Sequence, residues 1–170
     1  ALASHALRER ALAVIVPRHP ERWDAVSKMA LELGYRAARR SDAHIPVDVE
    51  VVIGDSMGEM FSWYANASVV VMGGTLGDTG GQNLIEPCAV GVPVVLGPST
   101  YNFLQAAEYA LAAGAALRVS DAKEALDRVL EWLDDERSRQ AAGEAARGFV
   151  AHHRGASLRT LELIRQTIAR

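Results

Sequence analysis

A glycine-rich loop between two apolar runs constrains the fold of this chain more than any other stretch. The loop, Gly73–Glu86, holds five of the fourteen glycines and follows the apolar run Val69–Met72. A short apolar helix signal and a second apolar run, Pro93–Leu96, come after it. Strand, loop, helix and strand form a βαβ unit, in which ligands bind at the carboxyl ends of the strands. Because glycine lets backbone N–H groups approach a ligand closely, we expect a phosphate or carboxylate at this loop.

The rest of the chain alternates strand and helix signals, which is typical of a parallel sheet. Further strands are predicted at Ala11–Val16, Arg36–Arg39, Val49–Ile53 and Ala115–Val119. Further helices are predicted at Trp23–Leu33, Met57–Ala67, Phe103–Ala113, Ala122–Leu133, Glu136–Val150 and Ser157–Ala169. We therefore predict an α/β fold, a Rossmann-like parallel sheet with helices on both faces and a helical C-terminal third.

Composition favours one soluble domain spanning residues 1–170. The net charge of −3 does not suggest a nucleic-acid partner, and neither an apolar run of membrane-spanning length nor a signal peptide is visible. The single cysteine, Cys88, excludes an intrachain disulfide, and its place on an apolar helix face predicts a buried, inert thiol. The chain begins at Ala1 rather than Met and enters a strand almost at once, so we expect a fragment of a longer protein.

Two predicted helices begin with a capping pattern directly after a buried strand, so both starts should face the same edge of the sheet. Ser56-Met57-Gly58-Glu59 matches the capping box Ser-x-x-Glu, and Asn83-Leu84-Ile85-Glu86 is a similar arrangement with asparagine as the cap. The backbone N–H groups of Met57 and Gly58 can bind an anion, while Glu59 can simply close its own box.

Glu86 and Arg18 are the side chains best placed for ligand chemistry. A carboxylate after a glycine loop can accept hydrogen bonds from a ribose diol, although Glu86 can equally serve its own helix start. Asn83 can cap that helix or touch the ligand, and the Gly80-Gly81 pair favours close ligand approach. Arg18, next to a strand end, can clamp a phosphate or carboxylate with a guanidinium fork, or lie in a solvated loop with His19 and Arg22.

Other site types have little support. Asp55 and Asp78 are better explained by turns or caps than by metal binding, because no cluster of histidine, cysteine and acidic residues has metal-ligand spacing. The first strand lacks a G-x-G-x-x-G sequence after it, and the chain has no P-loop lysine. Dehydrogenase and NTPase functions are therefore disfavoured, and we predict neither a metal nor a cofactor.

Several segments in the same order resemble one enzyme family. They are PRHPER (17–22), GDSMGEM (54–60), VVMGGTL (70–76) and GGQNLIEPCAVGVPVVLGPSTYNF (80–103). Together they resemble the C-terminal half of 3-deoxy-D-manno-octulosonic acid (Kdo) transferases, over most of the chain from about Ala11. The E-P-x-x-x-G-x-P-V core within the last segment is shared more widely by GT-B glycosyltransferases.

The resemblance implies the donor-binding domain of a two-domain GT-B enzyme. Such an enzyme transfers Kdo from CMP-Kdo to a lipid A precursor (lipid IVA) at the cytoplasmic face of the bacterial inner membrane. CMP-Kdo is its substrate and CMP its product, while the acceptor and the membrane are contacted through an N-terminal domain that this chain lacks. By the same resemblance, the CMP contacts would be Pro17 and Arg18, then Met57, Gly58 and Glu59, then Asn83, Leu84, Ile85 and Glu86, with Glu86 on the ribose.

Two positions depart from the family pattern, and one catalytic group is missing. Gln82 stands where the family commonly has histidine, which removes a charge-assisted contact, and Leu84 stands in place of a common proline. The family's general base is a glutamate of the absent N-terminal domain, so we predict that this chain folds, binds CMP weakly and transfers nothing. The alternatives are another GT-B nucleotide-sugar transferase or epimerase, and a non-enzymatic flavodoxin-like binding module.

Overall fold

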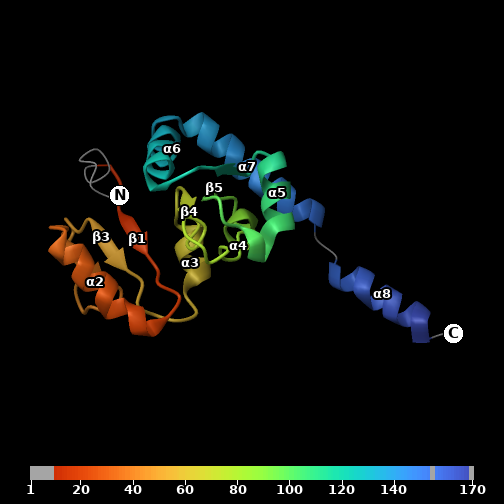
Figure 1. Ribbon diagram of the computed structural model, residues 1–170, viewed down its shortest axis with the longest axis horizontal. Coiled ribbons are helices and arrows are strands. Elements are labelled where there is room, and N and C mark those ends of the chain that lie inside the picture. The colour runs from red at the N-terminus through yellow and green to blue at the C-terminus, as the bar shows by residue number, and fades with distance from the viewer. Residues whose placement is uncertain (1–9, 154–155, 169–170) are drawn as a thin grey trace. The chain divides into compact units, whose positions relative to one another are not determined.

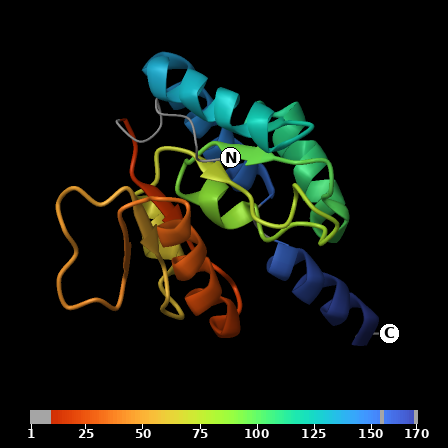
Figure 2. The same ribbon diagram turned by 60° about the vertical axis from the view of Figure 1, so that its left-hand side comes forward.

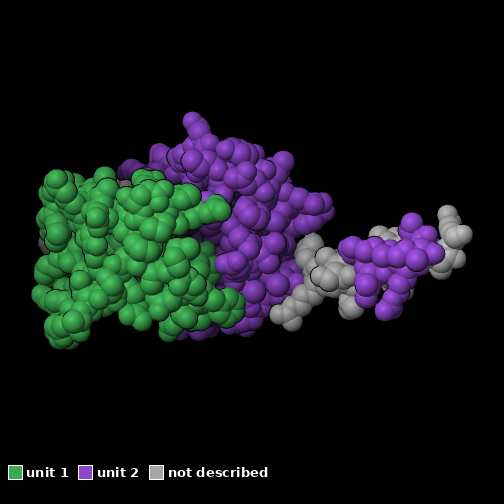
Figure 3. All heavy atoms as spheres, turned by 90° about the horizontal axis from the view of Figure 1, so that it is seen from below, with its two compact units in different colours: residues 1–66 green, residues 67–170 purple. Residues whose placement is uncertain are grey.

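A computed structural model describes residues 10–153 and 156–168, and its chain divides into two compact units, residues 1–66 and 67–170 (Figure 3). Unit 1 contains β1 (Ala13–Ile15), a 3-10 turn η1 (Pro20–Arg22), α2 (Trp23–Glu32), β2 (Ala37–Arg39), β3 (Val51–Ile53) and α3 (Met60–Ala65). Unit 2 contains β4 (Val70–Val71), α4 (Ile85–Ala89), β5 (Val94–Leu96), η2 (Tyr101–Phe103), α5 (Leu104–Ala112), β6 (Ala116–Arg118), α6 (Ala122–Asp134), α7 (Glu136–His153) and α8 (Ala156–Ile168). The prediction that the chain is a single domain stays a prediction.

Unit 1 is built on a three-stranded parallel sheet with the order β1-β3-β2. Its central strand, β3, is buried at all three positions, as its run of β-branched residues requires. On one face, Val26 and Ala30 of α2 pack with Val51 and Ile53 of β3. Figure 2 brings this unit forward, with α2 lying across the strands.

Unit 2 has a second three-stranded parallel sheet, in the order β4-β5-β6, with β5 fully buried at its centre. Val94 and Leu96 belong to a core cluster that also contains Cys88 of α4 and residues of α5 and α7. Val95 points to the opposite face, where it clusters with Ala125 and Trp132 of α6. Helices therefore cover both faces of this sheet, and Figure 1 shows α4 and α6 on opposite sides of β5. The predicted α/β fold with parallel strands and helices on both faces is confirmed.

The predicted start of the helix after β3 is wrong. We expected Met57–Ala67 with a Ser56–Glu59 capping box, but α3 runs only from Met60 to Ala65 and has no side-chain cap. Gly58 has φ +82°, in the left-handed region, which a right-handed helix cannot contain. The Ser56 hydroxyl donates to the carboxylate of Glu59 instead of capping a backbone N–H. The Ser-x-x-Glu pattern here stabilises a turn.

The predicted cap of a helix in unit 2 is confirmed at α6. Asp121 caps α6 by accepting a hydrogen bond from the backbone N–H of Glu124 at 2.8 Å, as its position before an amphipathic run predicts. Among the described residues, no helix has the length and apolar character needed to cross a membrane.

Candidate functional site

The predicted site residues of unit 1 follow two parallel strands at the same edge of their sheet. The last residues of the three strands lie side by side: Ile15 of β1 pairs with Ile53 of β3, and Ile53 pairs with Arg39 of β2. The loops that follow therefore leave the sheet at one edge. Pro17 and Arg18 are in the loop after β1, and 54–59 form the turn after β3.

The loop after β1 is fixed at its base by a tryptophan. Trp23, the first residue of α2, donates its indole Nε1–H to the carbonyl of Pro17 at 3.1 Å. Arg18 lies just beyond this bond, and its side chain is exposed. His19 and Arg22 are exposed too, and the His19 Nδ1 lies 3.8 Å from Glu21, which is typical of a solvated loop.

Two residues that follow β2, Arg40 and Ser41, hold the turn after β3 in place. Sequence patterns did not single out either residue. The guanidinium Nη2 of Arg40 donates to Oε1 of Glu59 at 3.2 Å, and the other Glu59 oxygen accepts from Ser56. Ser41 donates its backbone N–H and its hydroxyl to the carboxylate of Asp55, at 3.0 and 2.5 Å. Partial burial raises the pKa of Asp55, but the hydrogen bonds from Ser41 outweigh it and hold that pKa below its ordinary value. Asp55 thus has the turn role that we predicted.

The sequence places these two residues at the right sheet edge, but it does not reveal their contacts. They come directly after the predicted strand Arg36–Arg39, so in a parallel sheet they belong to the same edge as the loops after β1 and β3. The turn that they hold presents Met57 to solvent, with its side chain 70% exposed. Gly58 is exposed as well, so the backbone of this turn is accessible to a ligand.

In unit 2, Asn83 organises the start of α4. Its side-chain oxygen accepts from the backbone N–H of Ile85 at 3.1 Å, and its Nδ2 donates to Oε1 of Glu86 at 3.0 Å. The predicted capping box is wrong in its register, because Leu84 occupies the N-cap position and makes no side-chain cap bond, while Asn83 stabilises the turn before the helix. Glu86 is exposed and the described residues give its Oε2 no hydrogen bond. Leu84 is 1% exposed and belongs to the core of this unit.

The helices behind these two turns are short. α3 has six residues and α4 has five, so each contributes little of the macrodipole of a long helix. An anion at either turn would depend on individual N–H groups and nearby arginines rather than on a helix dipole.

The glycine loop is closed by its own protein contacts. Gly80 and Gly81 have φ of +75° and +79°, a conformation that glycine adopts readily. A Cβ at Gly80 would meet the Tyr101 ring. The Tyr101 hydroxyl donates to the Asp78 carbonyl at 3.0 Å, and Asn102 Nδ2 donates to the Thr79 carbonyl at 2.9 Å. Packing against η2 explains the Gly80-Gly81 pair without a ligand.

Cys88 has a structural role in the core and is not a reactive group. Cys88 is fully buried, and burial raises the pKa of its thiol to about 12, so the predicted buried thiol is confirmed. No three histidine, cysteine or acidic side chains within 10–153 and 156–168 lie close enough to hold a metal ion.

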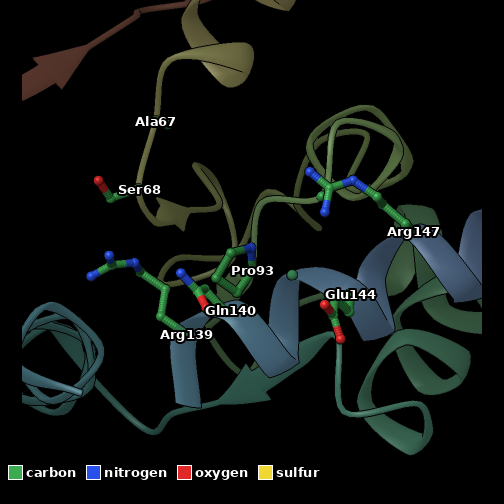
Figure 4. A pocket seen from close by; sticks show the side chains of 9 residues that line it. Ala67, Ser68, Pro93, Arg139, Gln140, Glu144 and Arg147 are labelled. Carbon is green, nitrogen blue, oxygen red and sulfur yellow. The ribbon is translucent and has the colours of Figure 1, made fainter. Parts of the chain in front are cut away.

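A cavity of about 340 Å³ lies elsewhere in unit 2. It is at the amino ends of the strands, next to Ser68 before β4 and Pro93 before β5, and Arg139, Gln140 and Glu144 of α7 flank it (Figure 4). None of the predicted site residues lines it, and ligands of parallel α/β sheets bind at the opposite, carboxyl ends of the strands. This cavity is therefore not the candidate site.

The sequence profile of the family "Glycosyl transferases group 1" matches residues 35–149, which is more than half of the chain. The chain belongs to this family. The match spans both the Met57–Glu59 turn and the Asn83–Glu86 turn, so both candidate turns lie within family sequence.

Two named relatives within the glycosyl transferases are both 3-deoxy-D-manno-octulosonic acid transferases. A 3-deoxy-D-manno-octulosonic acid transferase of Bordetella pertussis is 46% identical over 167 residues, which are 96% of this chain and 39% of the relative. The transferase of the same name from Haemophilus influenzae is 34% identical over 161 residues, 94% of this chain and 38% of the relative. The chain therefore spans about two fifths of the length of these curated relatives.

A solved structure shares the fold over most of its length. The C-terminal CMP-Kdo binding domain of WaaA from Acinetobacter baumannii matches with a TM-score of 0.82 and 33% identity, covering 88% of this chain and 79% of that one. The spinosyn forosaminyltransferase SpnP matches at 18% identity with a TM-score of 0.54, which supports the fold alone. The resemblance to the C-terminal domain of Kdo transferases is confirmed.

Proposed function

We propose that this chain is the donor-binding part of a Kdo transferase and that it binds CMP-Kdo. The observation that carries the proposal is the match to the CMP-Kdo binding domain of WaaA, at a TM-score of 0.82 and 33% identity. The 46% identity to a named Kdo transferase supports it independently. Under this proposal the donor is a substrate and CMP the product, and neither a metal nor a cofactor takes part.

The chemistry of the candidate residues fits a cytidylate. Glu86 has one carboxylate oxygen engaged by Asn83, which orients the group, and the second oxygen can accept from a ribose hydroxyl. Arg18 is an exposed guanidinium beside a strand end, suited to a phosphate. The Met57–Glu59 turn adds accessible backbone N–H groups, which stabilise negative charge on the departing CMP.

Catalysis would need a partner domain. In the proposed reaction, a general base activates an acceptor hydroxyl of a lipid A precursor, lipid IVA, and the transfer inverts the anomeric centre. The base, the acceptor site and the membrane contact would belong to an N-terminal domain, at the cytoplasmic face of the bacterial inner membrane. The curated relatives leave room for such a domain, since this chain covers only 39% of the Bordetella protein. Alone, this chain is expected to bind CMP and to transfer nothing.

A thermal-shift comparison of CMP, UMP, UDP and GDP tests the proposal. CMP should raise the unfolding temperature most, because a ligand that binds the native state stabilises it by mass action. A larger shift with UDP or GDP would contradict the proposal and favour another nucleotide-sugar transferase or epimerase. No response to any nucleotide would favour a non-enzymatic binding module.

A further inference from the structure

We propose that Arg40 binds the phosphate of the cytidylate while it holds Glu59 in place. The inference rests on the proposed function, and it adds a binding residue in a strand-end loop that sequence patterns did not single out. It concerns unit 1 alone, in which Arg40 is hydrogen-bonded to Glu59 and the Met57-Gly58 turn leaves the same edge of the sheet.

The backbone of Arg40 is anchored to the central strand. Its N–H donates to the carbonyl of Ile53, the last residue of β3, at 2.8 Å. The side chain therefore starts from the carboxyl edge of the sheet, where the turn after β3 begins. Its guanidinium reaches Oε1 of Glu59 at 3.2 Å and remains 50% exposed.

Arg40 retains hydrogen-bonding capacity after it has bound Glu59. A guanidinium has five N–H donors, and Glu59 is the one side-chain partner that the described residues give Arg40. Glu59 also has a second partner, because its other carboxylate oxygen accepts a hydrogen bond from the Ser56 hydroxyl. A half-exposed guanidinium with unused donors is suited to bridging a carboxylate and a phosphate oxygen.

The other arginines in and beside β2 are engaged differently. Arg39 pairs with Asp24 of α2 at 2.7 Å, and Arg36 pairs with Asp48 and with the buried Glu50. Arg39 and Arg40 therefore contact different elements, Arg39 reaching α2 and Arg40 reaching the turn after β3. Arg40 is thus the arginine of this segment that faces the candidate turn.

Arg18 lies in the loop after β1, at the same edge. The strand order β1-β3-β2 separates the Arg18 and Arg40 loops by two strand spacings, roughly 10 Å. Two long, flexible arginine side chains flanking the turn after β3 can both reach an anion seated on that turn. The strand order thus places two arginines at the sheet edge from which this turn leaves.

Arg40→Gln tests the inference, and Arg39→Gln is the matched control, because it removes the same charge from the adjacent residue. Arg40→Gln should weaken CMP binding about tenfold or more, as expected for loss of a charge-assisted hydrogen bond, whereas Arg39→Gln should change it less than about twofold. Calorimetric titration of CMP into each variant of the full chain measures both effects. Equal CMP affinity of wild type and Arg40→Gln would overturn the inference.

A second measurement separates phosphate binding from a merely structural role. An adjacent guanidinium lowers the pKa of a bound phosphate, which the phosphorus NMR shift of CMP reports during a pH titration. Saturating CMP should show a lower phosphate pKa on wild type than on Arg40→Gln; identical values would overturn the role. Failure of wild type to bind CMP would instead refute the proposed function.

Discussion

Glu59 and Glu86 differ in how many of their carboxylate oxygens the protein already engages. Both oxygens of Glu59 accept hydrogen bonds, from Ser56 and Arg40, whereas Glu86 accepts one, from Asn83. A carboxylate that is oriented at one oxygen and open at the other is suited to accept a bond from a ligand hydroxyl without reorganising. We therefore propose the ribose contact for Glu86, whereas the contacts of Glu59 stabilise its turn.

The Glu86→Gln variant tests this assignment. Loss of the negative charge should weaken CMP binding by about 1.5–3 kcal/mol, the usual value of a hydrogen bond to a charged group. Binding of 2′,3′-dideoxy-CMP, which lacks the diol, should be weak and indifferent to the substitution. Glu144→Gln, on the rim of the α7 cavity, is the control and should leave CMP affinity unchanged. Equal losses for both nucleotides in Glu86→Gln would contradict a ribose contact.

At the scale of elements, the glycine loop and the end of β5 interlock. Thr75 is buried, and its hydroxyl donates to the Met72 carbonyl at 2.7 Å and accepts from the Gly97 N–H at 2.8 Å. The Ser99 N–H donates to the Thr75 carbonyl at 3.0 Å. The loop that leads to the Asn83–Glu86 turn is therefore attached to two strand ends.

Gly97→Ala should break this attachment, and Gly77→Ala is its matched control. A Cβ at Gly97 would collide with the backbone of Thr75, which cannot move aside as a flexible side chain can. We expect a loss of about 1–3 kcal/mol in the free energy of unfolding. A Cβ at Gly77 meets nothing within 4 Å, so that variant should be neutral or slightly stabilised. Urea unfolding measures both, and similar stabilities would contradict the interlock.

The sequence predicted the strands and the fold class well, because buried β-branched runs such as Val51–Ile53 and Val94–Leu96 have few alternatives. It failed at the start of α3, where Ser56 and Glu59 satisfy each other instead of the backbone. It also missed Arg40, since its contact with Glu59 depends on β2 pairing with β3, and strand order is not written in any local pattern. Side-chain contacts across a sheet edge are tertiary information, which single-sequence motifs do not carry.

At the scale of the whole molecule, the residues that we propose to bind the donor are distributed over the two compact units. Pro17, Arg18 and the Met57–Glu59 turn belong to unit 1, whereas Asn83 and Glu86 belong to unit 2. The central claim of our account is that this chain binds CMP through these residues. The claim concerns CMP binding alone, so it can be tested on this chain without an acceptor.

Backbone amide NMR shifts recorded during a CMP titration test this claim most directly. Our account predicts that the largest shifts fall on Arg18, on the Met57–Glu59 turn and on the segment 83–86. An absence of shifts at these residues, or shifts centred on the α7 residues Gln140, Glu144 and Arg147 that line the cavity, would contradict it.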